Sequence, residues 1–281
     1  MKKASIQICG TGSGVGKSVL TAGLCRIFLQ DGFKVAPFKA QNMSLNSFVT
    51  VEGGEIGRAQ AMQAAACRLK PSVDMNPVLL KPTSNTGSQV IVCGKPVGNM
   101  SALEYYGYKN RARTRVLKSF HRLRKKFDVI VIEGAGSPAE VNLKAHDIVN
   151  MKMAEAAKAP VILVGDIDKG GVFAWLVGTL ELLTQKERRR VKGFIINKFR
   201  GDKRLLKPGI DFLEKKTGLE VLGVIPYFAN IKIPEEDSAA LQSERGGSHS
   251  NSKKSIQIAV IKLPHLSNFT DFDALKNEPD V

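Results

Sequence analysis

Long hydrophobic runs are absent from this sequence. No apolar stretch in its 281 residues approaches the roughly 18 that a membrane-spanning helix needs. Lys2 and Lys3 look like the basic start of a signal peptide, but the apolar stretch behind them is only a few residues long and ends at Gly10. We therefore expect a mature cytoplasmic N-terminus and no membrane partner.

Cysteine and histidine are both scarce. The four cysteines stand far apart, and no two of them form a Cys-x-x-Cys pair. Only four histidines accompany them, which argues against a structural zinc site. The pattern predicts reduced thiols in a cytosolic α/β protein. The cysteines are Cys9, Cys25, Cys67 and Cys93.

Acidic residues are too few to balance the basic ones. Lys and Arg number 42 against 26 Asp and Glu, so the formal net charge is +16. This surplus attracts anions, and by itself it leaves nucleic acid, anionic lipid and small polyanionic metabolites open. The densest basic stretch, residues 109–126, carries Val116, Phe120 and Leu123 at helical spacing. That spacing favours an amphipathic helix with a solvated basic face over a nucleic-acid site.

Short β-branched segments alternate with longer helical patterns along the chain. This alternation predicts an α/β fold: a P-loop NTPase-like, doubly wound, mostly parallel sheet with helices on both faces. The predicted strands are residues 5–9, 34–38, 129–133, 161–166, 193–197 and 221–225. The predicted helices are residues 18–30, 111–126, 148–158, 173–184 and 205–216.

The composition changes near residue 235. Residues 1–234 read as one nucleotide-binding domain, and the polar, Gly- and Ser-rich residues 235–254 read as a linker. The apolar run at 255–263 then predicts the first strand of a second α/β domain, of which residues 255–281 are too short to form the whole.

The strongest motif is GTGSGVGKS at residues 10–18, which follows a predicted strand and opens a predicted helix. Glycines in this context let backbone N–H groups converge on phosphate oxygens at a helix N-terminus. Lys17 is expected to reach the β- and γ-phosphates and Ser18 to ligate Mg²⁺. Thr11 stands where the common pattern has its first glycine. The predicted nucleotide-binding residues are Gly12, Ser13, Gly14, Val15, Gly16, Lys17, Ser18 and Val19.

Carboxylates and amides follow other predicted strands. Glu133 ends an apolar strand and precedes a Gly-rich turn, where an open α/β sheet binds ligands, so we expect it to hold the metal with Ser18. Asp166 and Asp168 likewise stand at the end of an apolar predicted strand, and for these carboxylates a structural capping role and a functional role are equally open. Residues 39–46 gather ammonium and amide groups suited to phosphates or carboxylates, although such a segment alone also fits a polar loop.

Ordered blocks across the chain resemble the cobyric acid synthase family of cobalamin biosynthesis. They include GTGSGVGKSVLTAGLCRIF (10–28), KAQNMSLNS (39–47), EIGRAQAMQA (55–64), MNPVLLKP (75–82), IEGAGSPAEVNL (132–143), DIVNM (147–151), GDIDKGGVFA (165–174), INKFRGD (196–202) and GVIPY (223–227). The family's N-terminal half is similar in fold to dethiobiotin synthetase. Its members continue into a class I glutaminase domain. Residues 255–275 of this chain resemble the beginning of that domain. This resemblance implies that the glutaminase half is absent from this chain.

The resemblance implies an ATP- and Mg²⁺-dependent amidation of peripheral carboxylates of adenosylcobyrinic acid a,c-diamide. In this reaction a substrate carboxylate and ATP form an acyl phosphate and ADP. Ammonia from glutamine then displaces the phosphate to form the amide. Lys17 and Asp147 are the implied catalytic residues, and Asn197 resembles the asparagine that reads adenine. The implied substrate-binding residues are Lys39, Gln41, Asn42 and Gln60. Gly14 replaces an acidic residue frequent in the family. A separate glutaminase domain as a partner and a homodimeric assembly are both open possibilities.

Two other functions remain as alternatives. A dethiobiotin-synthetase-like carboxylase would use the same fold. A partitioning-type ATPase would bind DNA or membrane through the +16 charge. Such ATPases usually carry an extra lysine early in the loop, where this chain has Cys9, Gly10 and Thr11, so we expect no nucleic-acid partner.

Overall fold

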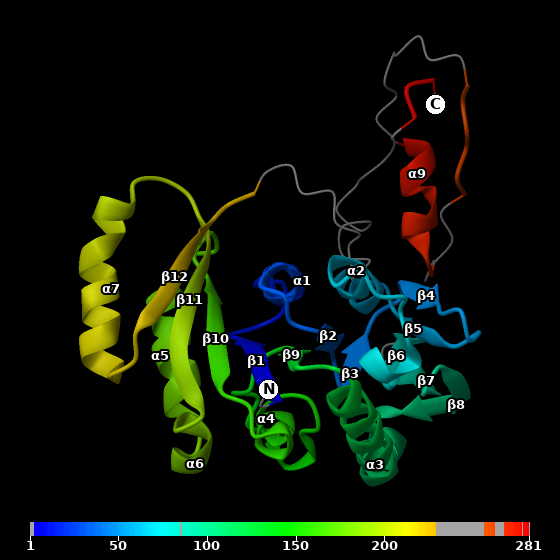
Figure 1. The fold of residues 1–281 in the computed structure, drawn as a ribbon, viewed down its shortest axis with the longest axis horizontal. Coiled ribbons are helices and arrows are strands. Elements are labelled where there is room, and N and C mark those ends of the chain that lie inside the picture. Colours follow the sequence, from blue (N-terminus) through cyan, green and yellow to red (C-terminus); the bar gives the residue numbers. More distant parts are fainter. Residues whose placement is uncertain (1–2, 85, 229–255, 262–266, 277, 281) are drawn as a thin grey trace.

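The computed structural model describes residues 3–84, 86–228, 256–261, 267–276 and 278–280. Its centre is a six-stranded sheet in the order β12-β11-β10-β1-β9-β2, with every neighbouring pair parallel (Figure 1). This confirms the predicted doubly wound sheet. The strands are β1 (Ala4–Gly10), β2 (Val35–Phe38), β9 (Val129–Glu133), β10 (Val161–Asp166), β11 (Val191–Phe199) and β12 (Val221–Pro226).

Helices cover both faces of this sheet because its strands are apolar on both sides. In β9, Val129 and Val131 pack into the core beneath α1 (Lys17–Gln30), while Ile130 and Ile132 pack into the core on the other face. Figure 1 shows α1 over one face of the sheet, with α4 (Met151–Ala157) beyond the other. The remaining longer helices are α3 (Ala102–Lys126), α5 (Val172–Glu181) and α7 (Lys203–Thr217), with the short α6 (Gln185–Arg188).

A second sheet lies between β2 and α3 in the sequence. Its order is β3-β6-β7-β8, with β3 (Gln41–Met43), β6 (Val78–Pro82), β7 (Gly87–Val92) and β8 (Lys95–Ser101). The segment between β3 and β6 holds the hairpin of β4 (Ser47–Val49) and β5 (Glu55–Gly57), α2 (Arg58–Ala66) and the 3₁₀ turn η1 (Val73–Met75). Nothing in the sequence reading predicted this sheet.

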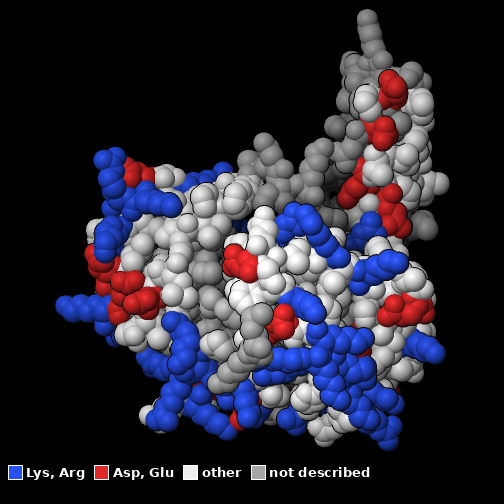
Figure 2. Space-filling view, in the orientation of Figure 1, with Lys and Arg blue, Asp and Glu red and all other residues white. Residues whose placement is uncertain are grey.

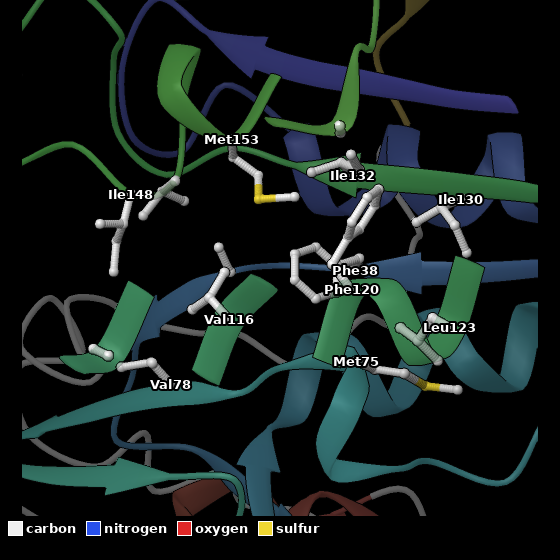
Figure 3. Packing of buried hydrophobic residues seen from close by; sticks show 14 of the residues in the cluster. Phe38, Met75, Val78, Val116, Phe120, Leu123, Ile130, Ile132, Ile148 and Met153 are labelled. Carbon is white, nitrogen blue, oxygen red and sulfur yellow. The ribbon is translucent and has the colours of Figure 1, made fainter. Parts of the chain in front are cut away.

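One apolar core joins the two sheets. The rings of Phe38 on β2 and Phe120 on α3 meet edge-to-face with centroids 5.4 Å apart (Figure 3). Ile130 of the main sheet and Val78 and Val90 of the second sheet are fully buried in the same cluster. The packing of α3 against both sheets therefore holds them together.

Two helices begin three or more residues away from their predicted starts. Helix α3 begins at Ala102 rather than at residue 111, because Ser101 and Glu104 form a capping box that starts it earlier. Helix α4 begins at Met151 rather than at residue 148, because the carboxylate of Asp147 accepts the N–H groups of the preceding turn.

The predicted linker, residues 235–254, lies outside the described residues. The sequence predicts a strand at residues 255–263, of which the described residues 256–261 form none. A strand needs a ladder of backbone hydrogen bonds, and here the Ile256 N–H donates to the Asp280 carbonyl at 3.0 Å without such a ladder. The 3₁₀ turn η3 (Phe269–Phe272) and α9 (Asp273–Lys276) follow. Asn268 accepts hydrogen bonds from Ser47, and Asp271 pairs with Arg58 at 3.1 Å, which seats this segment on β4 and α2.

The basic surplus gathers on the outer face of α3. Figure 2 shows Lys and Arg crowded over this helix, while its inner residues Val116, Phe120 and Leu123 are buried. The amphipathic helix predicted from the spacing is therefore confirmed. Within the described part of the chain, no helix combines the length and the apolar character required to cross a bilayer.

Candidate nucleotide and metal site

The Gly-rich loop connects β1 to α1 at the carboxyl end of the main sheet. Lys17 is buried, and its ammonium donates to the carbonyl oxygens of Gly12 at 2.7 Å and Gly136 at 3.1 Å. Gly16 has φ of 96°, and a Cβ there would lie 2.2 Å from Nδ2 of Asn197. Only glycine fits this position, so the loop conformation depends on it.

Glu133 is the centre of the polar cluster beside this loop. Its side chain is 1% exposed, and its Oε1 accepts from Ser18 Oγ at 2.8 Å and from Lys39 Nζ at 2.9 Å. Its Oε2 accepts from Gln63 Nε2 at 2.6 Å and, more weakly, from Gln60 Nε2 at 3.4 Å. The structure thus brings Ser18 and Glu133, which the sequence paired as metal ligands, together with Lys39 and Gln60, which the resemblance implied as substrate-binding residues.

Burial alone would raise the pKa of the Glu133 carboxyl. The attraction of Lys39 and the hydrogen bonds from Gln63, Lys39 and Ser18 together outweigh this, so the pKa of Glu133 lies below its ordinary value. Glu133 is consequently a carboxylate at neutral pH, which is the form that ligates a cation.

The donor set fits Mg²⁺. A hydroxyl and a carboxylate are hard oxygen ligands, and Mg²⁺ is commonly held by one or two carboxylates together with substrate phosphates. The described residues contain no group of three or more His, Cys, Asp or Glu side chains that could hold a metal alone. Ser18 and Glu133 would therefore hold the ion jointly with a nucleotide, while Lys39 balances the carboxylate in the structure described here.

A chain of amides supports this cluster from the second sheet. Asn42 Nδ2 donates to Gln60 Oε1 at 3.1 Å, and Gln60 in turn reaches Glu133. A Cβ on Gly57 would lie 2.4 Å from Asn42 Nδ2 and 2.6 Å from Gln60 Oε1, so this close approach requires glycine. Gln41 is turned away from the cluster, and its Oε1 accepts from Tyr105 at 2.6 Å.

Sequence reasoning missed two residues of the site. Gln63 makes the shorter amide contact to Glu133, and its three-residue offset from Gln60 on α2 is the helical spacing that could have revealed it. Asn76 donates to the carbonyl oxygens of Lys39 at 3.0 Å and Val78 at 2.9 Å, and so fixes the backbone that carries Lys39. No sequence pattern points to Asn76.

Asn197 lies against the loop backbone. Its Nδ2 donates to the Val15 carbonyl at 2.8 Å, and its side chain is buried. The next residue, Lys198, has φ of 60° and donates to the Gly14 carbonyl and to Asp166, both at 2.7 Å. These contacts tie β11 to the loop, and adenine recognition by Asn197 stays a prediction.

Asp147 accepts three backbone hydrogen bonds. Its Oδ1 accepts the N–H groups of Val149 and Asn150, each at 2.8 Å, and its Oδ2 accepts that of Lys152 at 3.0 Å. Asn150 then hydrogen-bonds Ala135 in the turn after Glu133. Asp147 therefore orders the backbone beside the site, and its catalytic role stays a prediction.

Comparison with known proteins places these features in a family. The family described as "CobQ/CobB/MinD/ParA nucleotide binding domain" matches residues 6–240. The cobyric acid synthase of Desulfitobacterium hafniense (strain DSM 10664 / DCB-2) is 57% identical over 282 residues, covering 99% of this chain and 55% of that protein. That of Carboxydothermus hydrogenoformans is 59% identical over 278 residues, with the same coverage.

The chain spans about half the length of these curated relatives. Among solved structures, the signal recognition particle receptor FtsY from Elizabethkingia anophelis in complex with GDP aligns with a TM-score of 0.47 at 17% identity, covering 82% of this chain and 58% of that chain. With its Gly-rich loop at the edge of a parallel sheet and a family match across most of its length, the chain belongs to the CobQ/CobB/MinD/ParA nucleotide binding domain family.

Proposed function

We propose that this chain is the ATP-binding, amide-forming part of a cobyric acid synthase. The observation that carries the proposal is the buried Glu133 carboxylate, hydrogen-bonded to Ser18 of the phosphate-binding loop and paired with Lys39. This arrangement suits a Mg²⁺-bound triphosphate beside a second anionic reactant. Relatives at 57% identity that bear the name cobyric acid synthase support the choice of reaction.

In the proposed reaction, a peripheral carboxylate of adenosylcobyrinic acid a,c-diamide attacks the γ-phosphorus of ATP. The bond from phosphorus to the β,γ-bridging oxygen breaks, and its electron pair leaves with ADP. Ammonia then attacks the acyl carbon, loses a proton, and expels inorganic phosphate to leave the amide. Such transfer depends on positioning and charge neutralisation.

Each residue of the cluster has a role in this scheme. Lys17 binds the β- and γ-phosphates and stabilises negative charge on the transferring group. Ser18 and Glu133 hold Mg²⁺, which neutralises phosphate charge when bound. In this scheme Lys39, which is buried beside Glu133, orients the attacking carboxylate, and Asn42 and Gln60 bind the substrate beside it.

The proposal is tested by supplying ammonia directly. The chain is incubated with ATP, Mg²⁺, ammonium and adenosylcobyrinic acid a,c-diamide, and ADP and amidated corrinoid are quantified. We expect one ADP for each amide formed by the natural sequence. Lys17→Met should abolish both, whereas Lys118→Met, at an exposed site on α3, should leave them unchanged.

Three outcomes would contradict the proposal. Folded protein that forms no ADP at high ammonium would overturn it. Tight DNA binding at physiological salt, with ATP hydrolysis independent of corrinoid, would instead indicate a partitioning-type ATPase. Turnover of diaminopelargonic acid with bicarbonate would indicate a carboxylase.

A further inference from the structure

A pocket of about 220 Å³ lies between the second sheet and the first turns of α3. Its lining includes Gln41 on β3, Leu80 on β6, and Tyr105, Tyr106 and Lys109 on α3. Gln41 begins the strand that follows Lys39 in the chain, so the pocket starts beside the Glu133 cluster. The side chains that hydrogen-bond to Glu133 are Ser18, Lys39, Gln60 and Gln63, and none of them lines the pocket, which is therefore distinct from the nucleotide and metal site.

Lys109 supplies a half-buried cation to this pocket. Its ammonium lies 5.0 Å from the ring centroid of Tyr106 and 5.8 Å from that of Tyr105, and no carboxylate of the described residues is within 4.0 Å. Its side chain is half-buried, and burial lowers its pKa, while the charge of Asp147 acts in the opposite direction. A partly desolvated cation with no carboxylate in direct contact favours an anionic ligand.

The other polar groups of the pocket are held in place. The Tyr105 hydroxyl donates to Gln41 Oε1 at 2.6 Å, which fixes the amide of Gln41. The ring of Tyr106 stacks on His146 with centroids 4.9 Å apart, and His146 directly precedes Asp147. Gln41 therefore joins the pocket to β3, and the ring of Tyr106 joins it to the turn before α4 through His146.

The surrounding surface concentrates anions. Figure 2 shows Lys and Arg crowded over α3, the helix whose first turns line the pocket, and their summed field raises the local concentration of negatively charged ligands. The exposed ones are distributed along the outer face of the helix, whereas Lys109 reaches inward between two tyrosine rings. Charge is therefore available both to attract a polyanion and to fix one of its groups.

We propose that this pocket binds, through Lys109, a second carboxylate of the substrate that is converted in a different turnover from the one reacting beside Glu133, with the apolar rim of the substrate against Tyr105 and Tyr106. The inference rests on the proposed function, because it assumes a substrate that bears several carboxylates around a large ring. One carboxylate reacts beside Glu133 while another is anchored at Lys109. Holding the substrate at both carboxylates restricts its orientation and so positions the reacting carboxylate.

The test measures equilibrium binding of adenosylcobyrinic acid a,c-diamide to the full chain by corrinoid absorbance, with Mg²⁺ and a non-hydrolysable ATP analogue present. Lys109→Met should weaken binding about tenfold or more, because a charge-assisted hydrogen bond is lost. Lys118→Met removes the same charge from an exposed position on the same helix and should change binding less than about twofold. Affinity for the ATP analogue should stay the same in both variants.

A second comparison isolates the carboxylate. Adenosylcobyric acid carries amides in place of the carboxylates that are converted, so the preference of the natural chain for the diamide over this product should shrink in Lys109→Met. Lys109→Gln, which keeps a polar side chain, replaces Lys109→Met in both measurements if Lys109→Met unfolds at a lower temperature than the natural chain.

If a folded Lys109 variant binds the diamide as tightly as the natural chain does and keeps the same preference for it over adenosylcobyric acid, the inference is overturned and the proposed function stands. Failure of the natural chain to bind any corrinoid would overturn the proposed function itself.

Discussion

The ion pair of Glu133 and Lys39 can be broken by one nearly isosteric change, Glu133→Gln. Both side chains are almost fully buried, at 1% and 4% exposure, so neither charge can return to water without local opening. The glutamine oxygen can still accept from Ser18 and Lys39. Its amide nitrogen, however, would face Gln63 Nε2, which now lies 2.6 Å from Glu133 Oε2, and two donors would then meet.

The expected cost follows from these contacts. Breaking a buried ion pair by removing one partner costs about 3–5 kcal/mol, because the remaining charge is left without compensation. The retained hydrogen bonds place Glu133→Gln near the lower end, at about 3 kcal/mol. Lys39→Met alone should cost a similar amount. The double variant should be less destabilised than the sum of the two singles, because neither buried charge then remains.

The pH dependence of this loss provides the decisive measurement. The folded pKa of Glu133 lies below its unfolded value of about 4.3, so the charged form stabilises the fold above that pH. The contribution is lost as the pH falls through the folded pKa. Urea denaturation should therefore show the largest difference between the natural chain and Glu133→Gln at neutral pH, and a shrinking difference below about pH 4.3. A difference that stays constant from neutral pH to pH 3, or additive single variants, would refute the reasoning.

Three further changes test other parts of the structure. Gly16→Ala should lower the free energy of unfolding by more than about 1 kcal/mol and weaken ATP binding, because φ is 96° there and the Asn197 side chain occupies the position of the added Cβ. Its control is Gly23→Ala in the middle of α1, where the added Cβ meets no neighbouring atom, so the change should be neutral or stabilising. Urea titration and nucleotide binding distinguish the two. Phe120→Ala should cost about 3–5 kcal/mol in the same titration, and a loss below 1 kcal/mol would mean that the ring is not a core contact. Asp147→Asn should cost about 1 kcal/mol through one lost backbone acceptor, and an unchanged unfolding midpoint would contradict the capping contacts.

The main sheet and the phosphate-binding loop could be predicted because their signals are local. Val129–Glu133 is a continuous apolar strand that ends in a carboxylate, and its position at the carboxyl edge of a parallel sheet follows from the alternation of strands and helices. The loop carries its own lysine and serine. Combining these two local readings was sufficient to place Ser18 beside Glu133.

The second sheet could not be predicted because its strands owe their state to their neighbours. Strand β3 has only three residues, and β8 is largely exposed and contains Pro96 and Gly98. Such segments lack the alternation that marks a strand, and tertiary pairing decides their state. The same holds for Gln63 and Asn76, since a lone amide becomes a site residue only when the fold brings a carboxylate or a carbonyl to it.

The joint between the two sheets has a consequence for how the molecule comes apart. Lys39 and Ala40, which connect β2 to β3, are buried, and the Lys39 N–H donates to the Met75 carbonyl. Phe120 and Val90 belong to one core with Ile130. The second sheet therefore has no interior of its own to retain when the first is lost. Amide protons of β7 and β9 should exchange with solvent together, in a single global opening, and a fragment cut out between residues 41 and 101 should not fold alone.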